Sequence, residues 1–369
     1  MKRRTYLKSG GAAAIAGLAG CLNVTESNDA TTADDTTADT TTGTTREPDE
    51  PLTVATYDSF FGDEGTAGHW LKRAWEAEHD TTIEFTAPAN GINEFISRKK
   101  QNAGIDADLF VGLNTGELVR VDEELPDARL FDTVADDLSH ASRIKDSLQI
   151  DPRRRALPYD TGYISLVYDS TDIAEPQTFD DLTKPAYEGA LLAENAQTSD
   201  PGRAFLLWTI HEMGEDGYLD YWQDLVANDV RILDDWQPAY NAYLNNERPM
   251  VVSYSTDQVY YHDEGQLPHH QIGFLNDQGY ANPEAMARFA DTNQPETAAA
   301  FMDFVLTDEA QANIAVNNVQ FPATTTADLP DEYDQYAKEP PEPVTFTYEE
   351  LAGNLDGWIN EWARQIASS

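Results

Sequence analysis

The sequence is short of cysteine and of positive charge. A single cysteine, Cys21, occurs among 369 residues. The chain can therefore form no disulfide within itself, no cysteine-based zinc site and no iron–sulfur cluster. Lys and Arg number 24 against 66 Asp and Glu, which leaves a formal net charge of -42. So acidic a chain disfavours binding to nucleic acid or anionic lipid headgroups, and it suits cationic small molecules better.

Lysine is scarce even among the basic residues, with 8 Lys of 24, and the acidic residues are spread through every segment. This composition is typical of proteins adapted to molar salt and indicates a halophilic, archaeon-like source. Repulsion between like charges extends further as the Debye length rises from about 3 Å at ~1 M salt to about 10 Å at ~0.1 M. We therefore expect stability to depend on salt.

The first 21 residues have the pattern of an export signal. The paired Arg3 and Arg4 precede a small-residue apolar stretch that is too short to remain as a membrane-spanning helix. The arginines resemble a twin-arginine signal, and Leu18-Ala19-Gly20-Cys21 resembles a lipobox, whose cysteine becomes the lipidated first residue. We expect 1–21 to be a twin-arginine lipoprotein signal with Cys21 as the lipidation site. An ordinary signal peptide with an incidental cysteine is the alternative.

Residues 22–50 contain ten Thr among Asp, Glu, Ala and Ser, with almost nothing apolar to bury. Such a composition predicts a disordered tether. We expect the globular domain, 51–369, to be exported and anchored to the outer face of the cell membrane through the lipid alone.

Apolar periodicity in the globular part alternates between that of strands and that of helices. This alternation predicts an α/β fold with parallel strands, right-handed crossovers and ligand-binding loops at the carboxyl ends of the strands. A long apolar run at 156–168 predicts a strand that crosses between lobes, and Asp200 with Pro201 predicts an N-cap and first turn. The expected strands are 52–57, 82–86, 107–112, 156–168, 190–193, 230–233, 249–254 and 271–274, and the expected helices are 66–78, 92–102, 203–213, 219–227, 236–246, 295–307, 308–318 and 348–367.

Six segments carry a resemblance to a known family: TYDSF at 56–60, PYDTGY at 158–163 with LVYD at 166–169, TSDPG at 198–202 with LLW at 206–208, DWQPAY at 235–240, VSYST at 252–256 and GWINEW at 357–362. In this order they resemble the thiamine-binding proteins of bacterial ABC importers. The resemblance implies a two-lobe periplasmic-binding-protein fold of type II, with the ligand cleft between lobe 1 (about 51–158 and 265–369) and lobe 2 (about 164–260). It further implies a monomer without cofactor or metal that delivers thiamine to a permease driven by a separate ATPase.

Carried over by position, the family's ligand contacts fall at Tyr57, Asp58, Asn90, Gly91, Ser199, Asp200, Trp236, Tyr254, Ser255, Thr256, Asp257 and Tyr260. Aromatic faces and a carboxylate suit a cationic thiazolium ring. Two departures concern ligand identity: Val319 stands where the family has a tryptophan, and Asp200 stands where it has a phosphate-side threonine. A carboxylate at the expected helix N-terminus predicts a preference for unphosphorylated thiamine.

Each of these residues also has a structural interpretation. Trp236 is more often a packing residue, and Asp200 is most simply a helix cap. The other tryptophans considered are expected to pack in the core or on helices: Trp70, Trp75, Trp208, Trp358 and Trp362.

Two alternative functions remain open at this point. Tyr260-Tyr261 followed by His262 resembles the tyrosine pair of ferric-binding relatives of the same fold, in which phenolates suit a hard ferric ion. An exported hydrolase is the other alternative, but no nucleophile elbow, zinc-binding helix or phosphate loop occurs in the sequence. We therefore expect a binding protein and not an enzyme.

Overall fold

The computed structural model describes residues 50–367 of the chain. The predicted signal, the lipidation site Cys21 and nearly all of the predicted tether lie outside the described residues. Within 50–367, no helix combines the length and apolar character that a membrane span requires.

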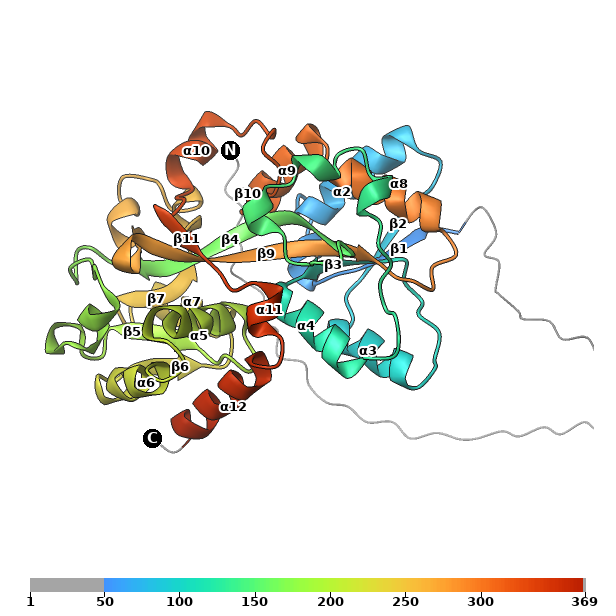
Figure 1. Cartoon of the computed structure of the whole chain (residues 1–369). Coiled ribbons are helices and arrows are strands. Elements are labelled where there is room, and N and C mark those ends of the chain that lie inside the picture. The colour runs from blue at the N-terminus through green and yellow to red at the C-terminus, as the bar shows by residue number, and fades with distance from the viewer. Residues whose placement is uncertain (1–49, 368–369) are drawn as a thin grey trace, which may run out of the picture. The chain divides into compact units, whose positions relative to one another are not determined.

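One mixed sheet organises the described part of the chain (Figure 1). Its strands run in the order β2-β1-β3-β9-β4-β7-β5-β6, while β10 and β8 pair with β4, and β11 pairs with β9. We call β2, β1 and β3 the first sheet half, and β7, β5 and β6 the second sheet half. The strands are β1 (Leu52–Ala55), β2 (Ile83–Thr86), β3 (Leu109–Leu113), β4 (Ala156–Tyr168), β5 (Leu191–Glu194), β6 (Arg231–Leu233), β7 (Met250–Tyr254), β8 (Gln271–Gly273), β9 (Gln278–Arg288), β10 (Phe321–Pro322) and β11 (Glu342–Val344).

The long strands β4 and β9 join the two sheet halves and lie side by side through the centre of Figure 1. They pair antiparallel with each other, and β9 pairs antiparallel with β3, as β4 does with β7. The expectation of a parallel sheet is correct for the strands within each half and wrong for the centre. The error arises because β9, which contains Pro283 and several polar residues, lacks the apolar pattern of a strand.

Helices pack against both sheet halves, and most of them begin within a few residues of the predicted positions. They are α1 (Asp58–Phe61), α2 (Ala67–Glu78), α3 (Ile92–Lys100), α4 (Thr115–Glu124), α5 (Asp200–Met213), α6 (Tyr218–Ala227), α7 (Trp236–Leu244), α8 (Pro295–Val305), α9 (Asp308–Asn318), α10 (Asp331–Tyr336), α11 (Tyr348–Leu351) and α12 (Leu355–Ile366). The predicted helix 348–367 is two helices, because the chain turns at Gly353, whose φ of 80° is accessible to glycine.

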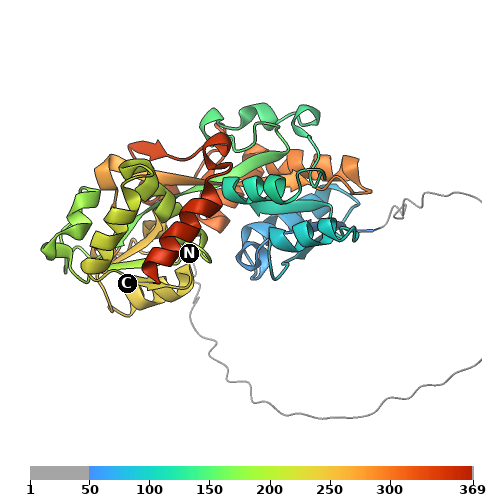
Figure 2. The same cartoon turned by 60° about the horizontal axis from the view of Figure 1, so that its bottom comes forward.

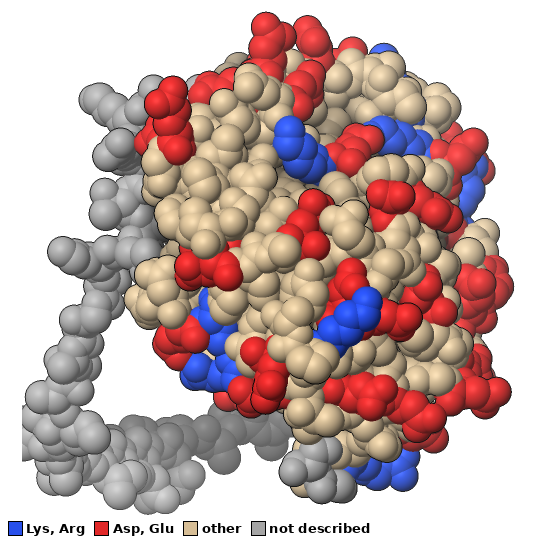
Figure 3. Space-filling view, turned by 90° about the vertical axis from the view of Figure 1, so that its left-hand side faces the viewer, with Lys and Arg blue, Asp and Glu red and all other residues tan. Residues whose placement is uncertain are grey.

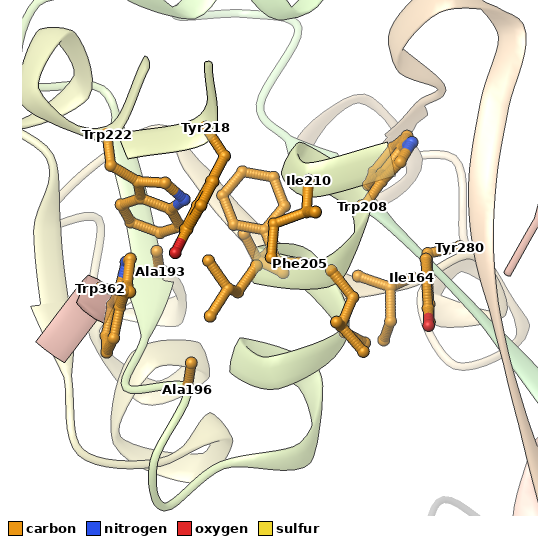
Figure 4. Close-up of a cluster of buried hydrophobic side chains, with 14 of the residues drawn as sticks. Ile164, Ala193, Ala196, Phe205, Trp208, Ile210, Tyr218, Trp222, Tyr280 and Trp362 are labelled. Atoms are coloured by element: carbon orange, nitrogen blue, oxygen red, sulfur yellow. The ribbon is translucent and has the colours of Figure 1, made fainter. Parts of the chain in front are cut away.

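The largest apolar core belongs to the second sheet half and its helices α5, α6 and α12 (Figure 4). Trp222 of α6 and Trp362 of α12 meet edge to face with ring centroids 5.3 Å apart, and Trp222 also meets Phe205 of α5 at 5.7 Å. Rings in this geometry gain electrostatic attraction in addition to their burial. Figure 2 shows α12 (red) beside the helices of the second half, so the C-terminal segment completes this core.

The predicted packing roles of the tryptophans are confirmed. Trp75, Trp208, Trp358 and Trp362 are buried. Trp70 is half-buried and stacks on Phe304 with ring centroids 6.3 Å apart.

Acidic side chains are dispersed over the face of the molecule shown in Figure 3. Asp and Glu occur there at many separate places, with fewer Lys and Arg among them. Such a distribution spreads the repulsion between like charges over this face, which bears on the salt dependence expected above.

Candidate ligand-binding site

Glu284 lies in β9 between two bulges of the sheet. The register of β9 shifts at Gly112 of β3 and again at Tyr159 of β4. A bulge opposes two residues to one and redirects side chains. The bulge in β4 brings both Tyr159 and Asp160 to Glu284, and Asp160 is its direct cross-strand partner.

Five side chains, from four segments of the chain, then form a network that we call the Glu284 cluster: Tyr57, Tyr159, Asp160, Glu284 and Asn318. The hydroxyls of Tyr57 and Tyr159 both donate to Glu284 Oε2, at 2.7 and 2.6 Å. The amide of Asn318 donates to Asp160 Oδ2 at 2.8 Å and to the hydroxyl oxygen of Tyr57 at 3.0 Å. The cluster therefore ties the end of β1 to the two central strands and to α9.

The Glu284 cluster contains two acids, the buried Asp160 and the half-buried Glu284, and no cation among its five side chains. No Lys, Arg or His forms an ion pair with Asp160 or Glu284 anywhere in residues 50–367. Burial, followed by the charge of Glu284, raises the pKa of Asp160 well above its usual value. Burial also raises the pKa of Glu284, although its bonds from the two tyrosines oppose that rise.

Two glycines make room for tyrosine rings at the site: the ring of Tyr57, which belongs to the cluster, and the ring of Tyr254, which lies beside it. A Cβ at Gly112, whose φ is 102°, would lie 2.7 Å from the ring of Tyr57. A Cβ at Gly162 would lie 2.6 Å from the ring of Tyr254 and 2.5 Å from Gln320 Oε1. Both rings thus lie directly against a strand backbone, where no other residue type leaves space.

Gln320 adds an unsatisfied acceptor at this place. The side chain is 8% exposed, and its Oε1 has no hydrogen-bond partner. Asp160 Oδ1 is likewise buried and without a partner. Buried polar atoms without partners are rare and indicate either a binding role or stored strain.

Trp236, Tyr240 and Tyr254 form an aromatic group at the carboxyl end of β7. Trp236 stacks on Tyr240 with centroids 4.9 Å apart and meets Tyr254 edge-on at 6.5 Å. Trp236 begins α7, where Asp235 caps the helix by accepting from the backbone N–H of Trp236. Tyr254 lies near enough to the Glu284 cluster for its electrostatics to be affected. Burial raises the pKa of Tyr254 most, and nearby carboxylates raise it further; these are Glu284, Asp200, Glu194 and Asp160.

The start of α5 differs from the prediction in one respect. Ser199 is the N-cap and accepts from the N–H of Gly202 at 3.4 Å, so the expectation that Asp200 is the cap is wrong. Ser and Asp both cap helices well, and Pro201 is tolerated anywhere in the first turn, so the sequence did not distinguish the two possible caps. Asp200 lies in the first turn and pairs with Arg203 at 2.9 Å.

Across from Asp200 lies Glu117 of α4, in a capping box with Asn114. Burial, and then the charge of Asp200, raises the pKa of Glu117 to about 8. The starts of α4 and α5 and the β9 residues 280–283 line a cavity of about 20 Å³. A drug-sized ligand needs a pocket of about 300 Å³ or more, so the walls of this cavity must separate before such a ligand can enter.

Glu194, the last residue of β5, is a second buried acid. Its side chain is fully buried, and neither carboxylate oxygen has a hydrogen-bond partner. Burial, and then the charge of Asp235, raises its pKa well above the usual value.

Some predicted contact residues are engaged in packing behind the site. Asp257 accepts from the hydroxyl of Tyr240 and lies 2.7 Å from His270 Nδ1, and all three side chains are buried. Ser255 and Thr256 are buried as well, and Ser255 Oγ has no partner. The segment 255–257 therefore supports the aromatic group from behind.

Other predicted residues lie outside the five side chains of the Glu284 cluster. Asp58 is exposed in the first turn of α1, and Asn90 is exposed in the loop before α3, where Gly91 is the N-cap with a φ of 51°. Tyr260 is 61% exposed, whereas the ring of Tyr261 stacks on His270 at 3.8 Å. Neighbouring Tyr260 and Tyr261 thus occupy different surroundings. No group of three His, Cys, Asp or Glu residues that could hold a metal occurs in the described part of the chain.

Val319 follows α9 and stands between Asn318 and Gln320, the two residues that reach the site. It has left-handed backbone angles, with φ 55° and ψ 48°, and packs against Tyr163 and Phe321. A β-branched residue is strained in this conformation. The turn allows both Asn318 and Gln320 to reach the central strands.

Sequence reasoning missed Asp160, Glu284, Asn318 and Gln320 as site residues. Asp160 lay inside the segment 158–163 that was already singled out, and a polar residue interrupting an apolar strand was the available signal for it. Gln320 directly follows Val319, which was noted only as a departure from the family. Glu284 had no such signal, because its strand was not recognised and the chain contains 66 acidic residues.

Comparisons with known proteins agree on the kind of protein. The family model described as bacterial extracellular solute-binding protein matches residues 89–341. The thiamine-binding periplasmic protein of Salmonella typhimurium is 28% identical over 317 residues, which are 86% of this chain and 93% of the relative. The thiamine-binding periplasmic protein of Escherichia coli is 28% identical over 319 residues, with the same two shares.

Solved structures show the same fold. A periplasmic thiamin binding protein superposes with a TM-score of 0.73 at 27% identity, covering 86% of this chain and 96% of that one. A ferric binding protein from Campylobacter jejuni superposes with a TM-score of 0.69 at 15% identity, covering 85% and 99%, and shows similarity of fold alone. The predicted periplasmic-binding-protein fold is therefore confirmed.

Proposed function

Because the chain belongs to the bacterial extracellular solute-binding protein family, we propose that it captures thiamine outside the cell membrane and delivers it to the permease of an ABC importer. The proteins of this kind that it resembles are binding proteins and not enzymes. The choice of thiamine rests on the relatives' names and on the chemistry of the site.

One observation carries the proposal: aromatic rings converge on the Asp160–Glu284 pair, and no Lys, Arg or His within residues 50–367 forms an ion pair with either acid. Tyr57 and Tyr254 border the Asp160–Glu284 pair, and Trp236 lies at the edge of Tyr254. A permanently cationic thiazolium ring gains from aromatic faces, at about 0.5–2 kcal/mol each, and from nearby carboxylates. The aminopyrimidine can donate hydrogen bonds to acceptors such as Gln320 Oε1.

The same charges disfavour phosphorylated ligands. Asp200, Asp160, Glu194 and Glu284 all act electrostatically on Tyr254, and Asp200 already neutralises Arg203. An added phosphate would meet like charge in a partly desolvated site. We therefore propose a preference for thiamine over its mono- and diphosphate, as the sequence predicted, although Asp200 acts from the first helical turn and not as the cap.

The remaining parts of the proposal concern place and movement. Lipidation of Cys21 would hold the domain at the outer face of the membrane through the tether 22–50. Two lobes, near 51–158 with 265–369 and near 164–260, would close on the ligand by bending at the central strands β4 and β9. The predicted contacts Asp58, Asn90, Gly91, Ser199 and Tyr260 would then complete the site from the surrounding loops.

Titration calorimetry in molar KCl tests the function. Thiamine, thiamine monophosphate and thiamine diphosphate are each titrated into ligand-free protein. We expect thiamine to bind most tightly. Equal or tighter binding of the diphosphate would overturn the preference, and absence of binding by all three would overturn the function itself.

A further inference from the structure

The pair of acids at the centre of the sheet is an unusual feature for a protein interior. Asp160 and Glu284 are direct cross-strand partners, at a position where like charges destabilise a sheet. Asp160 is fully buried, and no basic side chain in residues 50–367 pairs with either acid. Carboxylates at facing positions of paired strands, with no cation beside them, are costly to ionise together, which favours one proton held between the two groups.

The hydrogen bonds indicate where the shared proton lies. Glu284 Oε2 accepts from both Tyr57 and Tyr159, which favours its ionised form. Asp160 accepts only from Asn318, through Oδ2, and its Oδ1 has no partner. These bonds favour Asp160 over Glu284 as the acid that holds the proton.

A second observation points to a ligand at this place. Gln320 Oε1 is buried without a partner beside Gly162, two residues along β4 from Asp160 and on the same face of the sheet. The ring of Tyr254 lies against the same glycine. An aromatic face, an open acceptor and the acid Asp160 thus meet on one face of the central strands.

We propose that Asp160 and Glu284 form the cation subsite of the ligand pocket, and that binding of a cationic ring displaces their shared proton into solvent. In the balanced step, the O–H bond of the protonated acid breaks, the proton passes to bulk water or buffer, and the pair carries two negative charges beside the ligand's one positive charge. This inference rests on the proposed function and adds to it the residues that select a cation and the proton exchange that accompanies binding.

Other titratable groups lie around the Asp160–Glu284 pair and influence its protonation. Tyr57 after β1, Tyr159 in β4 and Tyr254 in β7 all have pKa values raised by burial and by the acids, so they stay protonated through neutral pH. Asp200 of α5 acts on Glu284, and Glu194 of β5 acts on Tyr254. Their negative charges favour retention of the proton until a cation arrives.

Calorimetry in two buffers with different ionisation enthalpies measures the exchanged protons. Thiamine is titrated into wild type, Asp160→Asn and Glu284→Gln near neutral pH in molar KCl. We expect wild type to release up to one proton per thiamine, and each variant to release much less and to bind about tenfold or more weakly, as expected when a close charge is lost. The control is Glu84→Gln, an exposed acid in β2, which should release protons as wild type does.

Infrared difference spectroscopy supplies a second readout on the same proteins. Thiamine binding should remove the C=O band of a protonated carboxyl group in wild type and in Glu84→Gln, and that band should be missing from ligand-free Asp160→Asn. Thiamine binding without proton release or loss of this band would overturn the inference and leave the proposed function standing. No binding of thiamine to wild type would overturn the proposed function first.

Discussion

The indole nitrogen of Trp236 donates a 3.0 Å hydrogen bond to Ser253 Oγ on β7. One ring face is covered by Tyr240, at 4.9 Å. The bond and the stack together fix the orientation of the indole beside Tyr254.

This arrangement separates two contributions of Trp236 to ligand binding. Phe keeps an aromatic face but loses the bond, Leu loses both, and Ser253→Ala removes only the bond. We expect thiamine affinity to fall by about 0.5–2 kcal/mol more for Trp236→Leu than for Trp236→Phe, with Ser253→Ala near the latter. Calorimetry measures the order, and equal losses for Phe and Leu would show that the aromatic face contributes nothing.

Glu117 predicts a pH dependence of stability. Its pKa in the folded protein is about 8, raised by burial and by Asp200, against about 4.3 in an unfolded chain. The folded state therefore binds the proton more tightly, so this contribution to stability is complete below pH ~4.3 and is lost as pH rises towards ~8.

Glu117→Gln tests the assignment, because Gln is neutral and can still accept from the N–H of Asn114. We expect the melting temperature of wild type to fall more than that of the variant between pH ~5 and ~8. Comparing the two cancels the other acids with raised pKa values, Asp160, Glu194 and Glu284. Parallel pH profiles for the two proteins would contradict the assignment.

The net charge of -42 predicts that the fold weakens at low salt. Dispersed surface carboxylates repel one another once the Debye length exceeds their spacing. The melting temperature should drop when KCl is lowered from molar concentration to ~0.1 M, and NaCl of equal ionic strength should act similarly if screening is the cause. A melting temperature independent of salt would argue against adaptation to high salt.

The lipobox-like segment predicts that membrane anchoring depends on lipidation of Cys21. Cys21→Ala should move the protein from washed membranes to the soluble fraction and leave its melting temperature unchanged, because no core residue precedes Leu52 in the described fold. A Cys21→Ala protein that still sediments with washed membranes would show that something other than the lipid holds it there.

Sequence patterns predicted most of the peripheral elements and one of the two central strands. The strand 156–168 was located accurately, because Leu166 and Val167 belong to a long apolar run. Strand β9 was missed because polar residues and a proline interrupt its apolar pattern, so Asn282, Pro283 and Glu284 read as loop.

The residues of the candidate site also divide into some that were predicted and others that were missed. Tyr57, Trp236 and Tyr254 were predicted because the family resemblance places ligand contacts at these positions, which follow expected strands or begin an expected helix. The partnership of Asp160 with Glu284 depends on a bulge and on an antiparallel register between segments more than a hundred residues apart, which no local pattern encodes.

A competition experiment tests the central claim, capture of unphosphorylated thiamine, most directly. Ligand-free protein in molar KCl is mixed with equal concentrations of thiamine, its mono- and diphosphate and ferric citrate, then desalted and denatured, and the released ligand is identified by mass spectrometry and metal analysis. The account predicts that thiamine is retained in preference to all the others. Retention of iron or of thiamine diphosphate in its place would contradict it.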